Sequence, residues 1–275
     1  MKNVDIKVVE GFGEEWDSYN QSSLTDKETK DLFDRYFNIF PKNFFAKNKV
    51  GIDIGCGSGR WAKHIAPLVK ALHCVDASNQ ALSVARNNLE SFSNCVFINS
   101  TTDSLSSLDQ KFDFGYSLGV LHHIPDTRKA LFDCTSVLKK GAPFLIYLYF
   151  AFDNKPFWYR FCWKISEPFR FLISRANFPT RKFITTLIAF FVYFPLSRLA
   201  LVAQKIGVNT RNIPLSTYKN TTFYTMRTDA LDRFGTRLEQ RFTKKEMHSM
   251  MIDSGLTDIK FSKNIPFWTA VGYKK

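Results

Sequence analysis

The run from residue 50 to residue 61 has the residue types and the spacing of a loop that binds a small polar ligand. Val50–Ile54 is a short apolar strand candidate that contains Asp53, and glycines follow at positions 55, 57 and 59. Because glycine has no Cβ, such a backbone can turn sharply and come close to a ligand. The helix expected next offers unpaired N–H groups at its start, which favour polar or anionic groups. The run therefore predicts a ligand-binding turn between a strand and a helix.

The spacing of the glycines separates this loop from that of a dinucleotide-binding domain. A dinucleotide site has the pattern Gly-x-Gly-x-x-Gly, in which the third glycine packs the helix on the strand. Here the third position is Arg60, and the additional glycine is Gly59. With Asp53 two residues before Gly55, the loop resembles the first motif of class I S-adenosylmethionine-dependent methyltransferases. A Rossmann-like domain that binds nicotinamide is the alternative.

A second acidic residue ends the next strand candidate, Ala71–Asp76, and Ser78 then caps a helix with apolar residues three or four positions apart. An acid at the tip of this strand can bind both hydroxyls of a ribose. The resemblance implies that Asp76 binds the cofactor ribose. Asp53 and the backbone around Gly55 and Gly57 would bind its amino-acid end.

The third strand candidate, Cys95–Asn99, leads into a departure from the family pattern. Relatives often have an aspartate near the position of Thr101 that meets the adenine amino group, and this chain lacks it. The adenine contact is then left to the Thr102 backbone or to Asp103. The cofactor-binding residues predicted on this basis are Asp53, Gly55, Cys56, Gly57, Gly59, Asp76, Ala77, Thr101, Thr102, Ser117 and Leu118.

Two histidines follow the fourth strand candidate, Phe112–Ser117. The run that contains His122 and His123 resembles the Leu-His-His turn on the substrate side of family members. Imidazole titrates near neutral pH, so it can take the proton from a hydroxyl acceptor. We predict that one of the two is catalytic; the competing interpretation is that they hold the turn by hydrogen bonds. The remaining histidines are dispersed, so no metal site is predicted.

Strands alternate with helices between residues 50 and 150, which predicts a parallel sheet with helices on both faces. A helix is expected from Asp126 or Thr127 to a stop at Gly141, and a strand over Pro143–Tyr149 that is buried on both faces. Ligands of such sheets bind beyond the carboxyl ends of the strands. The resemblance implies an α/β fold with a doubly wound, Rossmann-like seven-stranded sheet whose last strand is antiparallel.

The C-terminal residues complete this pattern. Thr243–Glu246 is a capping box that begins a helix with a stop at Gly255. Residues 257–264 and 266–273 alternate as expected for an antiparallel pair at the edge of the sheet.

Four segments are expected along the chain. Residues 1–45 resemble the segment that folds over the cofactor in bacterial small-molecule methyltransferases, although a surface helix is the alternative. Residues 46–150 form the S-adenosylmethionine-binding core. Residues 151–240 form a basic, aromatic helical cap with an acceptor-side segment, and residues 241–275 complete the core.

The inserted cap is basic and aromatic. Residues 151–220 hold eleven basic and two acidic residues, which is +9 of the chain's net charge of +13. Ile184–Leu196 is nearly all apolar, but a membrane span needs about 20 such residues. Because Pro195 and Arg198 interrupt it, we predict a buried or interfacial helix.

Three interpretations compete for this cap. It could be a helical lid with its own aromatic core and solvated bases, a face for an anionic membrane surface, or a nucleic-acid surface. The bases are spread among apolar residues and no nucleic-acid module is recognisable, so nucleic acid is not a predicted partner. Peripheral membrane contact through residues 151–220 stays open, as does a homo-oligomer.

Composition limits the remaining possibilities. A chain of 275 residues can bury a large core as one domain with an insertion. Its five cysteines are scattered and lack a Cys-x-x-Cys pair, which fits neither a disulfide framework nor a zinc site. The first residues lack the apolar core of a signal peptide. A cytoplasmic location is predicted, with the inner face of the membrane as a variant of it.

The acceptor is the least determined part of the prediction. Tyr224–Phe242 is dense in arginine and acidic residues, and in related enzymes this segment commonly lines the acceptor pocket; a salt-bridge network is the alternative. The predicted acceptor-binding residues are Trp16, Tyr147, Tyr224, Arg227, Asp229, Arg233 and Arg237.

The resemblance implies methyl transfer from S-adenosylmethionine, with S-adenosylhomocysteine as product, to a small or lipid-linked acceptor. A hydroxyl of a sugar-like or other metabolite is the preferred site. The alternatives are methylation at carbon or nitrogen of a lipid quinone or metabolite, and a catalytically silent cofactor-binding partner subunit.

Overall fold

The computed structural model describes residues 2–21 and 23–275, and the chain divides into two compact units. The first, called here the core unit, comprises Met1–Ala151 and Leu238–Lys275. The second, the helical unit, comprises Phe152–Arg237 and is inserted between the two parts of the core unit.

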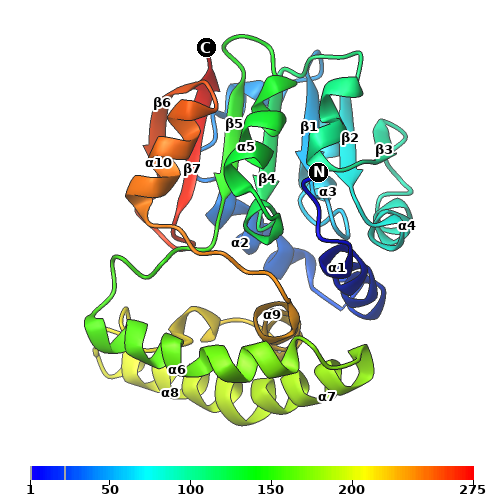
Figure 1. Cartoon of the computed structure of the whole chain (residues 1–275). Coiled ribbons are helices and arrows are strands. Elements are labelled where there is room, and N and C mark those ends of the chain that lie inside the picture. Colours follow the sequence, from blue (N-terminus) through cyan, green and yellow to red (C-terminus); the bar gives the residue numbers. More distant parts are fainter. Residues whose placement is uncertain (1, 22) are drawn as a thin grey trace. The chain divides into compact units, whose positions relative to one another are not determined.

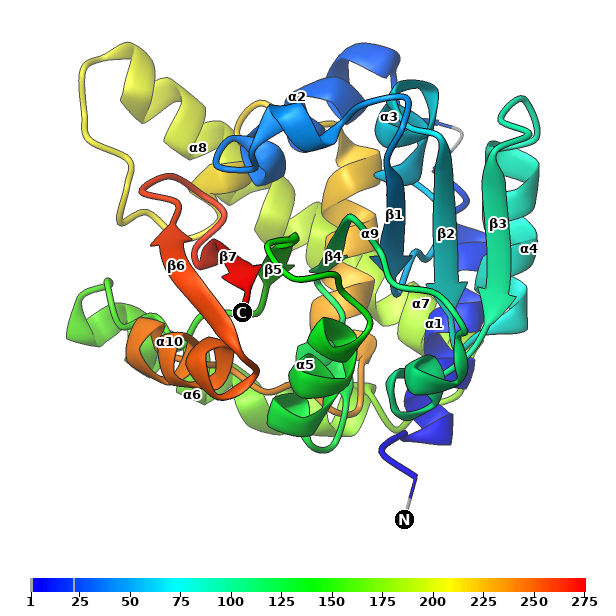
Figure 2. The same cartoon turned by 90° about the horizontal axis from the view of Figure 1, so that it is seen from above.

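The core unit is built on one seven-stranded sheet with the order β3-β2-β1-β4-β5-β7-β6 (Figures 1 and 2). The strands are β1 (Val50–Ile54), β2 (Ala71–Asp76), β3 (Cys95–Asn99), β4 (Phe114–Leu118), β5 (Pro143–Tyr147), β6 (Leu256–Phe261) and β7 (Thr269–Lys274). The first five pair in parallel, whereas β7 is antiparallel to both β5 and β6. This confirms the predicted α/β sheet with an antiparallel last strand.

Helices cover both faces of this sheet. The helices of the core unit are α1 (Ile6–Ser18), α2 (Asp26–Phe37), α3 (Ala62–Ile65), α4 (Asn79–Asn88), α5 (Thr127–Ser136) and α10 (Lys244–Asp253). Along β5, Leu145 and Tyr147 pack with α2 and α3 in one apolar cluster, while Phe144 and Ile146 pack with α5 and α10 in another. Alternate side chains of a strand point to opposite faces, so the continuous apolar run at β5 reflects burial on both.

The predicted helix starts agree with the structure, but the predicted end of α5 does not. Ser78, Asp126 and Thr243 cap α4, α5 and α10, and Thr243 forms the capping box with Glu246. The prediction that α5 extends to Gly141 was wrong, because it ends at Ser136.

Helix α5 ends before Gly141 because the residues after Ser136 form backbone hydrogen bonds outside the helix. The Phe112 N–H donates to the Val137 carbonyl at 2.9 Å, and the Lys139 N–H donates to the Phe112 carbonyl at 2.9 Å. The strand expected over Pro143–Tyr149 likewise ends at Tyr147, since Tyr149 and Phe150 pair with Phe242 instead. The two C-terminal strands are also displaced from the predicted ranges, to β6 and β7.

The helical unit contains α6 (Phe157–Ile173), α7 (Phe178–Ile188), a π-helical turn (Ala189–Tyr193), α8 (Phe194–Lys205) and α9 (Phe223–Gly235). The helix runs without interruption from Phe178 to Lys205, over 28 residues, and is long and apolar enough to cross a membrane by length and composition. The helix itself thus continues through Pro195 and Arg198, although Arg198 ends the stretch without charged residues, and the expectation of a buried or interfacial helix stays a prediction.

The local structure explains how the helix passes these residues. Pro195 is the second residue of α8 and lies just after the π-helical turn, where the hydrogen-bond pattern of the helix already departs from the α-helical one, so a residue without an N–H is accommodated. The Arg198 guanidinium folds back and donates to the backbone carbonyls of Lys219 and Thr221.

The aromatic residues of the helical unit mostly lie outside its core. That core consists of Ala189, Tyr193, Tyr218, Met226 and Ala230. Phe157, Phe161, Phe183 and Phe191 are instead exposed. The interpretation of the cap as a lid whose aromatics form its own core therefore fails for these residues.

Candidate active site

The loop after β1 is shaped by glycines in the left-handed region. Gly55, Gly57 and Gly59 have φ angles of 77°, 53° and 77°. A Cβ on Gly55 would lie 2.4 Å from a methyl carbon of Val120, and one on Gly57 would lie 2.9 Å from the indole of Trp16. The loop is thus enclosed by the turn after β4 and by α1, and glycine is required both by φ and by space.

Asp53 is a buried carboxylate beside this loop. Its Oδ2 atom makes no hydrogen bond of normal geometry, although the residue is only 1% exposed. Burial raises the pKa of Asp53 well above its usual range, an effect that the nearby Tyr116 hydroxyl opposes. A buried acceptor without a donor is costly unless a ligand supplies one. Asp53 therefore fits the ammonium group at the amino-acid end of the cofactor.

Asp76, at the end of β2, is tied to the same loop. Its two carboxylate oxygens accept hydrogen bonds from Gly57 N and Ser78 N, each at 2.9 Å. Burial raises the pKa of Asp76, and these backbone donors oppose the rise. A carboxylate has about four acceptor positions, so two amide bonds leave capacity for the hydroxyls of a ribose.

The loop after β3 distinguishes between the two candidates for the adenine contact. The Asp103 carboxylate accepts from the Thr101 hydroxyl at 2.5 Å and from Asn3 N at 3.2 Å, so both of its oxygens have partners within the protein. The Thr102 hydroxyl is buried and makes no hydrogen bond. The unused hydrogen-bonding capacity on this loop is thus that of the Thr102 hydroxyl, whereas the predicted contact was with the Thr102 backbone and stays a prediction.

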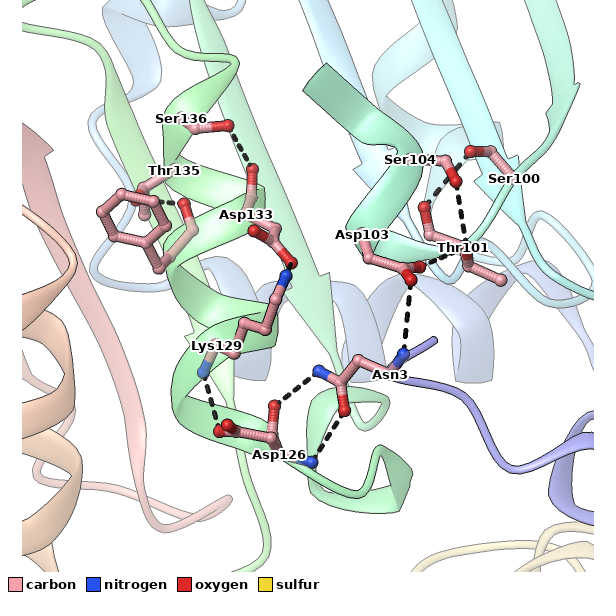
Figure 3. A network of polar contacts seen from close by, with 11 residues as sticks. Asn3, Ser100, Thr101, Asp103, Ser104, Asp126, Lys129, Asp133, Thr135 and Ser136 are labelled. Carbon is pink, nitrogen blue, oxygen red and sulfur yellow. Dashed lines mark hydrogen bonds and ion pairs between the residues drawn. The ribbon is translucent and has the colours of Figure 1, made fainter. Parts of the chain in front are cut away.

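An N-terminal strap connects two of the loops at the carboxyl ends of the strands (Figure 3). Asn3 donates from its backbone to Asp103, and its side-chain amide exchanges hydrogen bonds with the backbone of Asp126 at 2.8 Å each. The strap then leads into α1, whose Phe12 ring lies 4.9 Å from His123 and whose Trp16 covers Gly57. This places the N-terminal segment over the glycine loop.

Four other predicted cofactor residues have structural roles or lie at the edges of the loops. The Ser117 hydroxyl donates to the Ile54 carbonyl at 2.9 Å, which joins β4 to β1. Leu118 ends β4 and is buried. The Ala77 carbonyl accepts from Asn99 at 2.9 Å. Despite a hydrogen bond with Cys74, burial and the nearby Asp76 and Asp53 raise the pKa of Cys56 to about 11.

The two histidines occupy different environments in the short helix Leu121–His123. His122 is fully buried, and its ring stacks on Tyr149 with the centroids 3.9 Å apart. His123 donates from Nδ1 to the Leu238 carbonyl at 2.7 Å. Because a carbonyl can only accept, this bond places the proton on Nδ1 and the lone pair on Nε2. His123 is therefore in the tautomer that a general base needs.

The segment after the helical unit holds this turn in place. Gln240 N donates to the His122 carbonyl at 3.0 Å, and the Gln240 side chain donates to the Ile124 carbonyl at 2.7 Å. Arg241 forms a 2.7 Å ion pair with Glu239, and its guanidinium lies 5.1 Å from the centroid of Tyr149. The sequence prediction missed this role of residues 238–241, although their density of polar groups was the available signal.

The predicted acceptor residues are divided between the two units. Trp16 and Tyr147 belong to the core unit, where Tyr147 is buried with its ring against Tyr36. The other predicted acceptor residues lie on or directly after α9 in the helical unit: Tyr224, Arg227, Asp229, Arg233 and Arg237. Asp229 accepts a 2.6 Å hydrogen bond from the Tyr218 hydroxyl, as the alternative of a structural polar network expects. Within residues 2–21 and 23–275, the structure has no group of three or more potential ligands around a common metal position.

Comparison with known proteins was made on the sequence and on the fold. A sequence model of the family described as "Methyltransferase domain" matches residues 52–146, the range from β1 through β5. This range contains the glycine loop, Asp76, the adenine-side loop and both histidines.

Two curated relatives carry specific names. A ubiquinone biosynthesis O-methyltransferase of Coxiella burnetii is 28% identical over 112 residues, which are 40% of this chain and 46% of that protein. A phosphoethanolamine N-methyltransferase of Caenorhabditis elegans is 32% identical over 108 residues, which are 38% of this chain and 25% of that protein. The chain spans less than half the length of these curated relatives.

One solved structure resembles this chain over nearly its full length. It is a putative methyltransferase in complex with the Trm112 methyltransferase activator of Haloferax volcanii, with a TM-score of 0.52 and 13% identity. The alignment covers 94% of this chain and 96% of that one. At this level of identity, the likeness concerns the fold.

Proposed function

Because residues 52–146 constitute a class I S-adenosylmethionine-dependent methyltransferase domain, we propose that this chain transfers a methyl group to a hydroxyl of a small or lipid-linked metabolite. The observation that carries this proposal is the buried Asp53 carboxylate, whose Oδ2 atom makes no hydrogen bond, set beside a glycine loop that also engages Asp76. S-adenosylmethionine supplies a methyl group that is already activated by its sulfonium centre.

The protein's part in this chemistry is mainly binding and alignment. Asp53 holds the ammonium end and Asp76 holds the ribose, while Thr102 serves the adenine side. Trp16 and Phe12 of α1 exclude water from the loop. A fixed approach of the acceptor oxygen to the methyl carbon accounts for much of the rate gain expected from such an enzyme.

His123 is proposed as the base that removes the proton of the acceptor hydroxyl. Its Nδ1 bond to Leu238 supports the required tautomer, and its position after β4 places it at the carboxyl end of the sheet. His122, stacked on Tyr149, is proposed as a structural neighbour that fixes the His123 ring.

Methylation at nitrogen is a second candidate because one of the relatives is a phosphoethanolamine N-methyltransferase. An amine acceptor is deprotonated more readily than an alcohol, so loss of His123 would then affect the rate less. A catalytically silent partner subunit is a third possibility, and it predicts cofactor binding without turnover.

A labelled methyl donor distinguishes these functions. The purified chain would be incubated with a metabolite and lipid extract and S-adenosylmethionine labelled in the methyl group, followed by mass spectrometry. The proposal expects a labelled ether and formation of S-adenosylhomocysteine. A labelled amine would support the second candidate, and cofactor binding without any product would support the third.

A cytoplasmic location at the inner face of a membrane is part of the proposal, and fractionation of cells would test it.

A further inference from the structure

The long helix of the helical unit has its polarity reversed relative to a helix of a water-soluble domain. The residues that it buries are small or polar and recur about every four positions: Arg181, Thr185, Ala189, Tyr193, Ser197 and Ala200. The outward residues include Phe183 and Phe191, which are 65% and 68% exposed. Soluble helices bury their apolar stripe, so an outward apolar stripe indicates an apolar environment.

Polar residues of the inward stripe form hydrogen bonds within the helical unit. Arg181 donates to the Gly235 carbonyl at 2.9 Å, and Ser197 donates to the Phe194 carbonyl at 2.8 Å. Between Phe183 and Val202 the exposed residues of this helix are all apolar, mostly Phe, Leu and Val, whereas Thr180, Gln204 and Lys205 are exposed near its ends.

Helix α6 repeats this arrangement. It buries none of its residues fully, and its less exposed side combines aromatic with polar residues: Trp163 packs against Phe152, and Arg170 donates to the Arg233 carbonyl at 2.6 Å. Phe157, Phe161 and Leu172, which lie along another side of the same helix, are all more than half exposed. The helical unit therefore presents exposed apolar stripes on both α6 and the Phe178–Lys205 helix, which we call the phenylalanine face.

The net positive charge of the helical unit indicates which kind of surface the phenylalanine face would bind. Residues Phe152–Arg237 contain fourteen Lys and Arg and four Asp and Glu, a net charge of +10 out of +13 for the chain. Basic groups accompany the exposed rings, as where the Arg175 guanidinium lies 3.4 Å from the centroid of Phe171. Bases with apolar stems beside aromatic rings suit the boundary between acyl chains and anionic headgroups.

The same helix does not suit a transmembrane orientation. Its stretch without charged residues, Phe183–Ser197, is 15 residues long. It would extend about 22 Å, less than the roughly 30 Å of a bilayer core. Helix α9 packs along α7 and carries Arg227, Asp229, Asp232 and Arg233, which a span would bring into the hydrocarbon.

We propose that the helical unit docks in the plane of an anionic membrane surface, with the phenylalanine face inserted among the acyl chains and the basic side chains at the headgroups. Membrane docking is independent of methyl transfer, since lipid binding requires neither cofactor nor acceptor.

The first experiment is flotation of the purified full chain with vesicles. Vesicles of phosphatidylcholine and phosphatidylglycerol in a two-to-one ratio should bind the protein, and vesicles of phosphatidylcholine alone should bind it less. The double variant Phe183→Gln and Phe191→Gln should lower partition into the mixed vesicles roughly tenfold or more. The reason is that each substitution replaces an apolar ring, which gains free energy among acyl chains, by a polar amide. Phe132→Gln is the matched control, since Phe132 is 54% exposed but lies in the core unit; it should bind like the unmodified chain.

Charge is tested separately. Arg160, Lys164 and Lys205 are exposed, and their joint replacement by Gln should weaken binding at low salt far more than the same change at Lys245, Lys260 and Lys263. Absence of flotation by the unmodified chain would overturn the proposal, as would equal losses in the test and control variants. Dimers in solution that the Phe183→Gln and Phe191→Gln variant separates, without lipid binding, would assign the face to a second copy of this chain.

A fluorophore on Cys162 reports the orientation. Cys162 lies on α6 and is exposed, whereas the other four cysteines are buried or half-buried. An environment-sensitive dye attached there should shift to shorter wavelength with the mixed vesicles. Trypsin added outside these vesicles should still cleave after both Lys182 and Lys205, which bracket the apolar stretch. Protection of only one of these sites would contradict docking in the plane.

Discussion

The imidazole of His122 lies against the phenol ring of Tyr149, with the ring centroids 3.9 Å apart and the planes 29° from parallel. Arg241 approaches the same phenol ring at 5.1 Å. His122 is thereby held within an aromatic and cationic stack, while the neighbouring His123 bonds to Leu238. Two adjacent histidines of one turn thus have different environments, and we expect their substitutions to have different effects.

His123→Asn should lower turnover on the order of 100-fold or more, the usual contribution of a positioned base. Affinity for S-adenosylmethionine should stay nearly unchanged, because no cofactor contact is proposed for this ring. Steady-state kinetics and calorimetry measure the two quantities. Full activity of this variant would exclude His123 as the base and favour an acceptor other than a hydroxyl.

His122→Asn should have the opposite profile. Loss of a fully buried ring stacked on Tyr149 should reduce the free energy of unfolding by about 1–3 kcal/mol. Turnover of the folded fraction should remain close to that of the unmodified chain. Thermal unfolding together with kinetics tests this, and a large loss of turnover without a loss of stability would reverse the two assignments.

Asp53→Asn should stabilise the cofactor-free chain at pH 8 while weakening cofactor binding. The folded-state pKa of Asp53 is raised, so its stabilisation is complete below the ordinary value of 3.8 and is lost as pH rises through the raised value. The variant should therefore gain about 1–3 kcal/mol at pH 8 and nothing near pH 4. Urea unfolding at both pH values measures this difference. Equal stability at pH 8, or unchanged cofactor affinity, would contradict the assigned role.

Asp76→Ala should weaken S-adenosylmethionine binding by about 1.5–3 kcal/mol if the two ribose bonds are charge-assisted. Because Asp76 also accepts from Gly57 N and Ser78 N, Asp76→Asn is the companion variant that keeps one acceptor oxygen. It should lose less affinity than the alanine variant. Unchanged calorimetric affinity in Asp76→Ala would reject the ribose role.

Gly55→Ala should disrupt the cofactor loop for two separable reasons. The new Cβ would lie 2.4 Å from a Val120 methyl carbon, and a φ of 77° costs an alanine about 1–2 kcal/mol. Adding Val120→Ala removes the clash but leaves the backbone strain, so the double variant should recover part of the cofactor affinity. Val120→Ala alone is the control. No recovery would show that backbone conformation, and not contact with Val120, dominates at Gly55.

The sheet could be predicted because its signals are local. Each of the parallel strands is a short apolar run that ends at an acid, a glycine or a polar loop, and the pattern at Asp53 and Asp76 also resembles a known family. Gly141 did not predict where α5 ends. The helix ends at Ser136 because Val137 and Lys139 form backbone hydrogen bonds with Phe112, a residue more than twenty positions earlier in the sequence. Such a partner is visible only in the folded chain.

The site was predictable in its residue types more than in its bonding. Asp103 and Thr102 were equal candidates in the sequence, and their difference depends on Asn3, a distant residue that occupies one Asp103 oxygen. The continuity of the long helix through Pro195 likewise could not be predicted from the sequence. Pro195 normally ends a helix, but a π-turn placed directly before it lets the helix continue.

The pairing of Phe150 with Phe242 has a consequence for the order of synthesis on the ribosome. This pairing joins the segment just before the inserted helical unit to the segment just after it. Ala151 N donates to the Phe242 carbonyl at 2.9 Å. Strand β7, which covers the open edge of β5, is translated only after the whole helical unit. Domains tend to fold as they emerge, so the helices meet their surroundings while the nascent sheet still lacks its last two strands. The proposed membrane docking of the helical unit would therefore precede completion of the sheet that holds the proposed cofactor site.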